Sequence, residues 1–242
     1  SKDGAMKSNW LETLLKQLYP QSCLLCGAQT DHRSRFCGPC YQSLPFNHHA
    51  CPRCALPLPA DAPAETRCGA CLKSELPYAS CHTALRYEAP SNHLITQLKF
   101  RHQLHLTKPL ARLIIDRLGE LQNPPDLMLP VPLHQQRMRE RGFNQAQELA
   151  RVVAKHYRIP LEDSLVKRAR NTKAQSDLSE RLRRNNLRHA FRVHGSLQGS
   201  RVAILDDVIT TGSTINELSK TLQRHGAAEI TVWAVARSTI ER

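Results

Sequence analysis

Four pairs of cysteines, each with two residues between its members, occur within the first 71 residues of this 242-residue chain. The pairs are Cys23/Cys26, Cys37/Cys40, Cys51/Cys54 and Cys68/Cys71. Two thiolates at this spacing fit one tight turn and bind the same metal ion, so two pairs complete a tetrahedral site. Because four thiolates leave no open coordination position, the pattern predicts two structural zinc sites.

The pairs can combine in two ways. Sequential pairing gives one site of Cys23, Cys26, Cys37 and Cys40 and another of Cys51, Cys54, Cys68 and Cys71; an interleaved arrangement is the alternative. Residues 21–75 are rich in cysteine, proline and glycine and cannot build an apolar core, so they need metal ions for stability. The start of the chain lacks a charged-then-apolar export pattern, which favours metal binding over disulfides. We expect residues 6–76, with a helix over 9–20, to form an N-terminal zinc module.

The remaining residues, 77–242, alternate between strand and helix patterns. Strands are expected over residues 80–87, 126–131, 201–205 and 230–236. Helices are expected over residues 92–100, 107–121, 144–157 and 214–225, with Thr107 capping the second and Gly226 ending the last. Residues 167–189 are polar and basic, so we expect a mobile loop that leads to a short helix. The alternation predicts an α/β domain with a mostly parallel sheet flanked by helices.

Two acids and a polar turn follow the strand predicted over 201–205. The string is Asp206-Asp207-Val-Ile-Thr210-Thr211-Gly212-Ser213-Thr214. Ligands bind at the carboxyl ends of strands in open α/β sheets, and the start of the next helix presents free N–H groups that favour a phosphate. Thr214 and Glu217 have the spacing of a capping box, which marks that helix start. Gly212 lets the backbone approach a ligand, and the hydroxyls around it add donors.

Asp206 and Asp207 can accept hydrogen bonds from the 2- and 3-hydroxyls of a ribose and help to hold a Mg²⁺ shared with pyrophosphate. A plain strand, turn and helix with polar residues is the alternative interpretation. Two adjacent carboxylates repel each other unless something binds them, which disfavours that alternative. The string therefore predicts a site for a ribose 5-phosphate of the kind that binds phosphoribosyl pyrophosphate (PRPP).

Positive charge is concentrated in one stretch of the chain. The formal net charge is +13, and residues 133–192 hold 15 Lys or Arg against 6 Asp or Glu. Such a surplus suits a polyanionic partner, although a solvated basic surface is the alternative. Aromatic residues are only 5% of the chain, so stacking platforms are scarce and salt-sensitive contact with a nucleic-acid backbone is the better-supported form of binding. The candidates for that contact are Arg168, Arg170, Lys173, Arg181, Arg183 and Arg184.

The string from Asp206 to Thr214 resembles the PRPP-binding signature of type I phosphoribosyltransferases. Other segments resemble the ComF (ComFC/GntX) branch of that fold, as does the N-terminal double zinc ribbon. These segments are Gln97–Phe100, Val131-Pro132, Arg137, Arg141–Gln145, Arg168–Gln175, Leu178, Arg181, Asn185 and Ala190-Phe191. The resemblance implies a type I phosphoribosyltransferase fold in which Asp206 and Asp207 act on the ribose. The implied phosphate ligands are Thr210, Thr211, Gly212, Ser213 and Thr214, with Lys99, Arg137 and Arg141 at the pyrophosphate.

The resemblance to the ComF family also implies a function in the cytoplasm. The chain would serve bacterial natural transformation, handling incoming single-stranded DNA together with a ComFA-like helicase and a DprA-like recombination mediator. Its cofactors would be two structural zinc ions, and Mg²⁺ with PRPP. One alternative is a phosphoribosyltransferase that acts on a nucleobase, although the short polar segment 237–242 offers no obvious pocket for a base. A regulator that only senses PRPP is the other alternative.

Overall fold

The computed structural model describes residues 21–30, 35–100, 103–169 and 190–239. The chain forms two compact units, Ser1–Leu44 and Pro45–Arg242, and each is described by itself. The helix expected over residues 9–20 lies outside the described residues. Within them, no helix combines the length and the apolar character needed to cross a membrane.

The first unit is a small ribbon built around four cysteines. Strands β1 (Gln21–Ser22) and β2 (Gln29–Thr30) pair antiparallel, and the short helix α2 (Gly38–Gln42) begins directly after Cys37. The amide of Cys23 donates to the carbonyl of Ala28 at 2.7 Å, which closes the first cysteine turn. Phe36 and Leu44 are buried, but so few apolar residues cannot stabilise a domain without metal.

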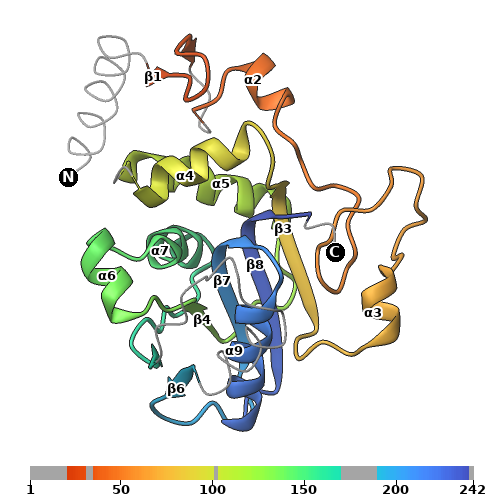
Figure 1. The fold of residues 1–242 in the computed structure, drawn as a ribbon, viewed down its shortest axis with the longest axis vertical. Coiled ribbons are helices and arrows are strands. Elements are labelled where there is room, and N and C mark those ends of the chain that lie inside the picture. The colour runs from red at the N-terminus through yellow and green to blue at the C-terminus, as the bar shows by residue number, and fades with distance from the viewer. Residues whose placement is uncertain (1–20, 31–34, 101–102, 170–189, 240–242) are drawn as a thin grey trace, which may run out of the picture. The chain divides into compact units, whose positions relative to one another are not determined.

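The second unit contains a four-stranded parallel sheet, seen at the centre of Figure 1. The strand order is β3 (Ser80–Arg86), β8 (Glu229–Arg237), β7 (Arg201–Ile209) and β4 (Leu127–Pro130). All three pairings are parallel, which confirms the four predicted strands and the predicted sheet. Strand β7 extends four residues beyond the expected end, so both acids lie within it.

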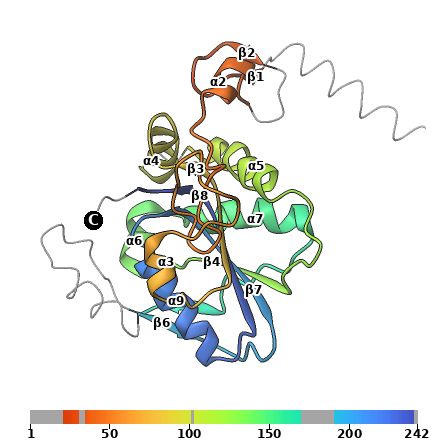
Figure 2. The same ribbon diagram turned by 90° about the vertical axis from the view of Figure 1, so that its right-hand side faces the viewer.

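Helices cover the two faces of this sheet (Figures 1 and 2). Helices α5 (Thr107–Leu118) and α7 (Gln145–Tyr157) pack on one face, where the ring of Tyr157 lies 6.1 Å from that of Trp233. Helix α9 (Ser213–Arg224) covers the other face. Its apolar side and the facing strand residues form one core, made of Ile215, Leu218, Leu222, Val202, Ile204, Ile230 and Val232. Each such side chain stabilises the fold by about 1.5–3 kcal/mol on burial.

Two predicted helix caps are wrong, although the helices themselves begin at or next to the predicted residue. Thr107 is the first residue of α5 and buried, whereas Leu106 occupies the N-cap position after the short 3₁₀ helix η1 (Leu104–Leu106). Helix α9 begins at Ser213 with Gly212 as N-cap, so Thr214 lies inside the first turn and forms no capping box with Glu217. In α7, by contrast, Asn144 is the N-cap, because its side chain accepts a hydrogen bond from the amide of Ala146.

The structure adds elements between β4 and β7 that the sequence patterns did not predict. Residues Gln135–Arg141 form helix α6, for which no element was predicted. Strands β5 (Val166–Arg168) and β6 (Phe191–Val193) pair antiparallel, so the loop expected over 167–189 begins inside a strand. The rest of that expected loop, residues 170–189, lies outside the described residues. Helix α4 (Ser91–Phe100) is present as predicted.

The second cysteine segment, residues 51–71, packs on the sheet at the edge formed by β3 (Figure 2). The amide of Cys81 donates to the carbonyl of Pro52, and the side-chain amide of Asn47 bonds both Ala55 and Thr83. Helix α3 (Gly69–Lys73) follows Cys68. The sequence composition changes near residue 76, but packing divides the chain at Leu44/Pro45, so this cysteine segment shares a unit with the sheet.

Candidate functional site

Asp206 and Asp207 lie near the carboxyl end of β7, where the predicted site was expected. The Asp207 carboxylate is buried, and its Oδ2 lies 2.9 Å from Nζ of Lys99 on α4. Its Oδ1 accepts a hydrogen bond from the amide of Val208, and Oδ1 of Asp206 accepts one from the amide of Asp207. The two acids are therefore held in fixed orientations by backbone and by one cation.

The environment of Asp206 disfavours its charge. Burial raises the pKa of Asp206 well above its ordinary value, and the neighbouring charge of Asp207 raises it further, while Lys99 opposes both effects. A carboxyl group with a raised pKa at the carboxyl end of a strand is typical of a ligand or catalytic site. Hydroxyl donors or a metal ion at this place would stabilise the ionised form.

The turn from Thr210 to Gly212 joins β7 to α9. Gly212 has φ +76°, a left-handed conformation that favours glycine, and the hydroxyls of Thr211 and Ser213 lie 2.9 Å apart. A Cβ at Gly212 would meet nothing within 4 Å, so the glycine is required by the backbone angle and the space above it is open. Thr210 and Thr211 are exposed, and Ser213 and Thr214 are half-buried. This is the geometry of an anion-binding helix start.

Three arginines share the electrostatic surroundings of the acid pair. Burial lowers the pKa of Arg141 on α6, the charge of Arg137 lowers it further, and Asp207 opposes the shift. Burial and Arg137 likewise lower the pKa of Arg168 on β5, with Asp206 opposing. Arg168 also lies over the ring of Phe191, 5.7 Å from its centroid. Crowded guanidinium groups beside two carboxylates form a ready partner for a polyanion such as pyrophosphate.

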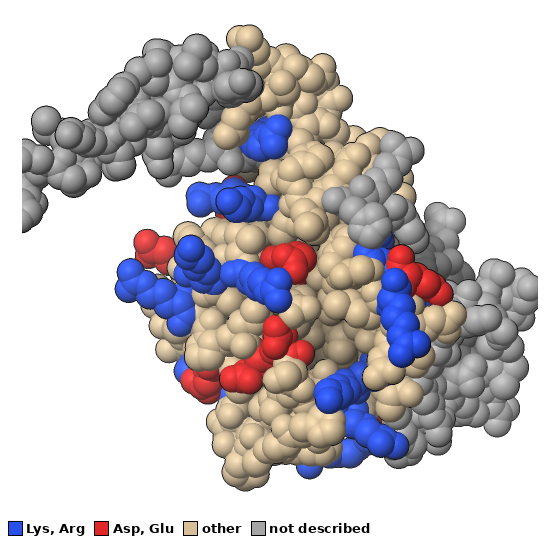
Figure 3. Space-filling model, turned by 90° about the vertical axis from the view of Figure 1, so that its left-hand side faces the viewer, with Lys and Arg blue, Asp and Glu red and all other residues tan. Residues whose placement is uncertain are grey.

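The structure thus places Lys99 in contact with Asp207 and brings Arg141 and Arg168 within electrostatic range of the acid pair. Arg137 interacts with these two arginines. The other predicted nucleic-acid candidates, Arg170, Lys173, Arg181, Arg183 and Arg184, lie outside the described residues. Figure 3 views the side of the second unit that carries α6 and α7; there Lys and Arg form separate groups with acidic groups between them. This described face therefore offers no continuous basic surface.

The cysteines form the two clusters of the sequential pairing. Cys23, Cys26, Cys37 and Cys40 make one, and Cys51, Cys54, Cys68 and Cys71 the other, with all sulfurs of a cluster within 4.8 Å of one another. In both clusters the second and third cysteines are in contact, with Sγ atoms 3.6 Å apart for Cys26/Cys37 and for Cys54/Cys68. Tetrahedral zinc with Zn–S bonds of about 2.3 Å places its sulfurs about 3.8 Å apart, so both clusters fit zinc. The two predicted zinc sites and their pairing are confirmed.

Arg237, at the end of β8, is a residue of this site that the sequence patterns missed. It is buried, and its Nη1 lies within hydrogen-bond distance of the carbonyls of Ile209 and Thr210, while its Nε donates to the carbonyl of Cys54 at 3.0 Å. The guanidinium therefore contacts both the turn that follows β7 and the second cysteine cluster. The one available signal was a charged residue directly after an apolar strand.

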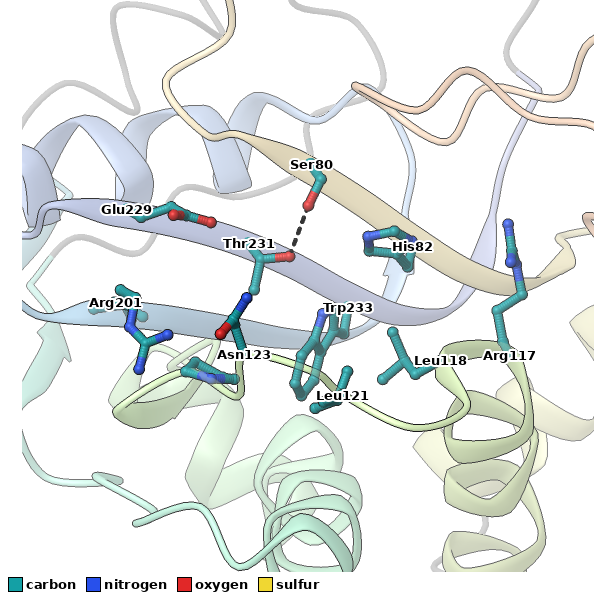
Figure 4. Close-up of a pocket in the computed structure, with 12 residues that line it drawn as sticks. Ser80, His82, Arg117, Leu118, Leu121, Asn123, Arg201, Glu229, Thr231 and Trp233 are labelled. Atoms are coloured by element: carbon teal, nitrogen blue, oxygen red, sulfur yellow. Dashed lines mark hydrogen bonds between the residues drawn. The ribbon is translucent and has the colours of Figure 1, made fainter. Parts of the chain in front are cut away.

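A cavity of about 400 Å³ lies at the opposite, amino end of the strands (Figure 4). Ser80, His82, Thr231 and Trp233 contribute to its lining, and Ser80 and Thr231 share a hydrogen bond. Arg201, the first residue of β7, also lines it. Six residues of extended strand separate Arg201 from Asp207, or about 20 Å. The cavity is therefore separate from the acid pair.

Comparison with known proteins places these features in one family. Residues 14–72 match the family model of the double zinc ribbon domain, and residues 109–241 that of the phosphoribosyl transferase domain. The chain is 35% identical over 207 residues to DNA utilization protein YhgH of Escherichia coli K12, covering 84% of this chain and 90% of the relative. It is 38% identical over 179 residues to competence protein F of Haemophilus influenzae (71% and 78%) and 26% identical over 188 residues to competence protein ComFC of Streptococcus pneumoniae (72% and 81%).

Solved structures are less similar. A purine phosphoribosyltransferase from Pyrococcus horikoshii aligns with a TM-score of 0.33 at 18% identity, covering 54% of this chain and 82% of that chain.

The parallel sheet, the family models and the two cysteine clusters define a type I phosphoribosyltransferase fold with a double zinc ribbon. The chain belongs to the ComF family, as its resemblance to that family indicated.

Proposed function

We propose that this chain binds PRPP at the carboxyl end of β7. The observation that carries the proposal is the acid pair of half-buried Asp206 and buried Asp207, placed directly before an open, left-handed turn and among cations from three other elements. A ribose 5-phosphate with a pyrophosphate group has hydroxyls, one phosphate and one polyanion in the arrangement that these groups suit. The match to the phosphoribosyl transferase domain supports the same ligand.

In this proposal each group has one task. The carboxylates of Asp206 and Asp207 accept hydrogen bonds from the ribose hydroxyls, which stabilises their ionised forms. The turn Thr210–Thr214 binds the 5-phosphate through backbone amides and hydroxyls. Lys99, Arg137 and Arg141 bind the pyrophosphate, and Mg²⁺ would supply further positive charge to it when bound.

A calorimetric titration with PRPP and Mg²⁺ tests the proposal. The double variant Asp206→Asn/Asp207→Asn should lose binding at least about 100-fold, since each lost charged hydrogen bond weakens binding by about 1.5–3 kcal/mol. The matched control is Asp126→Asn, an exposed acid paired with Arg201 at the other end of the sheet, which should bind as the wild type does. Equal affinity in the double variant and the wild type would refute the site.

The proposed biological role is the handling of incoming single-stranded DNA during natural transformation, in the cytoplasm. The names of the relatives, competence protein F and DNA utilization protein, support this role, as does the basic stretch over residues 133–192. A ComFA-like helicase and a DprA-like mediator are the partners that the family resemblance implies. Co-purification of each with the tagged chain, with and without single-stranded DNA, tests them.

The second candidate function is transfer of the ribose 5-phosphate to an acceptor, which the match to the phosphoribosyl transferase domain favours. Release of pyrophosphate from PRPP, screened with nucleobases and with single-stranded DNA as acceptors, decides it. Binding of PRPP without release in any condition would favour the remaining alternative, a regulator that senses PRPP.

A further inference from the structure

Arg237 joins three parts of the second unit that are far apart in the sequence. Its Nε donates to the carbonyl of Cys54 at 3.0 Å, and its Nη1 lies 3.1 Å from the carbonyl of Ile209 and 2.7 Å from that of Ser238. The same nitrogen contacts the carbonyl of Thr210. Arg237 is only 8% exposed, so this guanidinium has exchanged water for backbone carbonyls.

Two of these carbonyls, those of Ile209 and Thr210, belong to the end of β7 and to the start of the turn Thr210–Thr214. This turn is called the phosphate turn here after its proposed ligand. Hydrogen bonds from a charged donor are about twice as strong as neutral ones, and Arg donors have a fixed planar geometry. They therefore help to fix the peptide planes of Ile209 and Thr210. Removing the guanidinium takes the charged donor from the carbonyls of Thr210 and Cys54, whereas the carbonyl of Ile209 keeps a hydrogen bond from the amide of Ser238 at 2.9 Å. The peptide plane of Thr210 then becomes freer to rotate.

The carbonyl that accepts from Nε of Arg237 belongs to a zinc ligand, Cys54. Cys54 shares the second four-cysteine site with Cys51, Cys68 and Cys71, so its backbone position depends on the metal. The turn from Cys51 to Cys54, the zinc knuckle, is also bound to the edge of the sheet through Arg53, which donates to the carbonyls of Ala79 and Leu76. Ala55, next to Cys54, is 1% exposed and lies in the core of the sheet. The knuckle is thus a packed part of the sheet as well as a metal site.

We propose that the second zinc site sets the conformation of the phosphate turn, with Arg237 as the positioning residue between them. Zinc fixes Cys54, the Cys54 carbonyl orients the guanidinium, and the guanidinium holds the carbonyls of Ile209 and Thr210. The affinity consequence rests on the proposed binding of PRPP; the effect on the turn does not. The first zinc site belongs to the other compact unit, and the proposal concerns the second site only.

The first experiment compares Cys54→Ser with Cys26→Ser, which occupies the equivalent position in the other cluster. Each variant of the full chain should hold about one zinc ion where the wild type holds two. Hydrogen exchange is then followed in peptides over residues 206–214 and, as an internal reference, over α5. Cys54→Ser should speed exchange at 206–214 about tenfold with α5 unchanged, and Cys26→Ser should change neither. An equal effect of both variants, or none, overturns the proposal.

A second set of variants keeps all the zinc ligands, in case Cys54→Ser does not fold. Arg237→Gln should keep two zinc ions per chain yet speed exchange at 206–214 by a similar factor, and Arg237→Lys should restore it only in part. The matched control is Arg86→Gln, because Arg86 is the register partner of Arg237 on β3 but is exposed and paired with Glu88. Exchange at 206–214 in Arg237→Gln that equals that of the wild type contradicts the proposal, as does a uniform increase over the whole chain.

Titration with PRPP and Mg²⁺ separates this inference from the proposed function. Cys54→Ser and Arg237→Gln should bind PRPP about tenfold more weakly than Cys26→Ser and Arg86→Gln. If the wild type itself binds no PRPP, the proposed function fails, and the exchange data alone decide whether zinc sets the turn. If the wild type binds and all four variants bind equally well, the positioning role of Arg237 is refuted.

Discussion

The ammonium group of Lys99 lies 2.9 Å from Oδ2 of Asp207, with side-chain exposures of 19% and 5%. Lys99 comes from α4, more than a hundred residues before the acid in the sequence. The pair compensates a carboxylate that would otherwise be buried without a counter-charge. The Asp207 carboxylate is therefore already compensated in the ligand-free protein. A ligand that brings hydroxyl donors or its own cation can bind beside this pair.

Replacing Lys99 by Met should destabilise the protein, because it leaves Asp207 buried without its cation. The expected loss in the free energy of unfolding is about 3 kcal/mol, since breaking a buried pair by removing one partner costs about 3–5 kcal/mol and this pair is partly hydrated. Urea unfolding measures it. The control is Arg86→Met, which breaks an exposed pair with Glu88 and should cost less than about 1 kcal/mol. Similar losses in both variants would show that Lys99 does not compensate a buried charge.

Asp206→Asn should stabilise the ligand-free protein. Because the folded-state pKa of Asp206 lies above its ordinary value of 3.8, the folded protein holds this proton more tightly than the unfolded chain does. The contribution of Asp206 to the free energy of unfolding therefore falls as the pH rises from its unfolded value through the folded one. Melting temperatures measured from about pH 4 to about pH 8 should show an advantage of Asp206→Asn that grows with pH. A constant difference between the two proteins would contradict the raised pKa.

Gly226→Ala should destabilise the end of α9 more than Gly119→Ala destabilises the end of α5. Both glycines have positive φ, which costs about 1–2 kcal/mol for alanine. At Gly226 a Cβ would also lie 2.9 Å from the Cα of Gln198, whereas at Gly119 it meets nothing within 4 Å. The expected losses in the free energy of unfolding are about 3 and about 1 kcal/mol. Chemical denaturation of the two variants measures the difference, and equal losses would argue against the steric contact.

Binding of single-stranded DNA, if it is electrostatic, should weaken steeply with salt. About four backbone contacts predict a loss of about 50-fold in affinity between ~50 and ~200 mM salt. Changing Arg181, Arg183 and Arg184 together to Gln should lower the slope of log affinity against log salt by about 2. The charge-matched control changes three exposed residues of α5 and α9, Lys108, Lys220 and Arg224. A flat salt response, or the same slope change in the control, would reject the electrostatic mode.

Most of the fold followed from local patterns, and the differences have physical causes. The apolar run predicts β7 only as far as Leu205, because Asp206 interrupts it. The strand continues to Ile209 because its backbone pairs with β8, with Asp206 opposite Ala234 and Val208 opposite Ala236, whatever the side chains are. Helix α6 has seven residues and none is buried, so no apolar period marks it; the His134 cap and the left-handed Gly142 define it instead.

The acid pair, the turn and the cysteine clusters were predictable because each is contiguous or regularly spaced in the sequence. The contacts between separate segments were not. No local pattern connects Arg237 with Cys54, which lie 183 residues apart. The change in composition near residue 76 gives no sign that the second cysteine segment packs on the sheet. Such contacts depend on the strand order, which sequence alone left open.

The position of β8 has a consequence for how the protein is made. This strand is the last of the described strands in sequence order, yet it lies between β3 and β7 in the sheet. Until residues 229–237 have left the ribosome, β3 and β7 each present an unpaired inner edge, and such edges promote aggregation. Folding of the second unit must therefore wait until residues 229–237 have been synthesised and proceed through long-range pairing, which is slow. In a chain with this strand order, the unpaired edges of β3 and β7 need protection during synthesis. A sheet whose strands pair in the order in which they are synthesised would not need that protection.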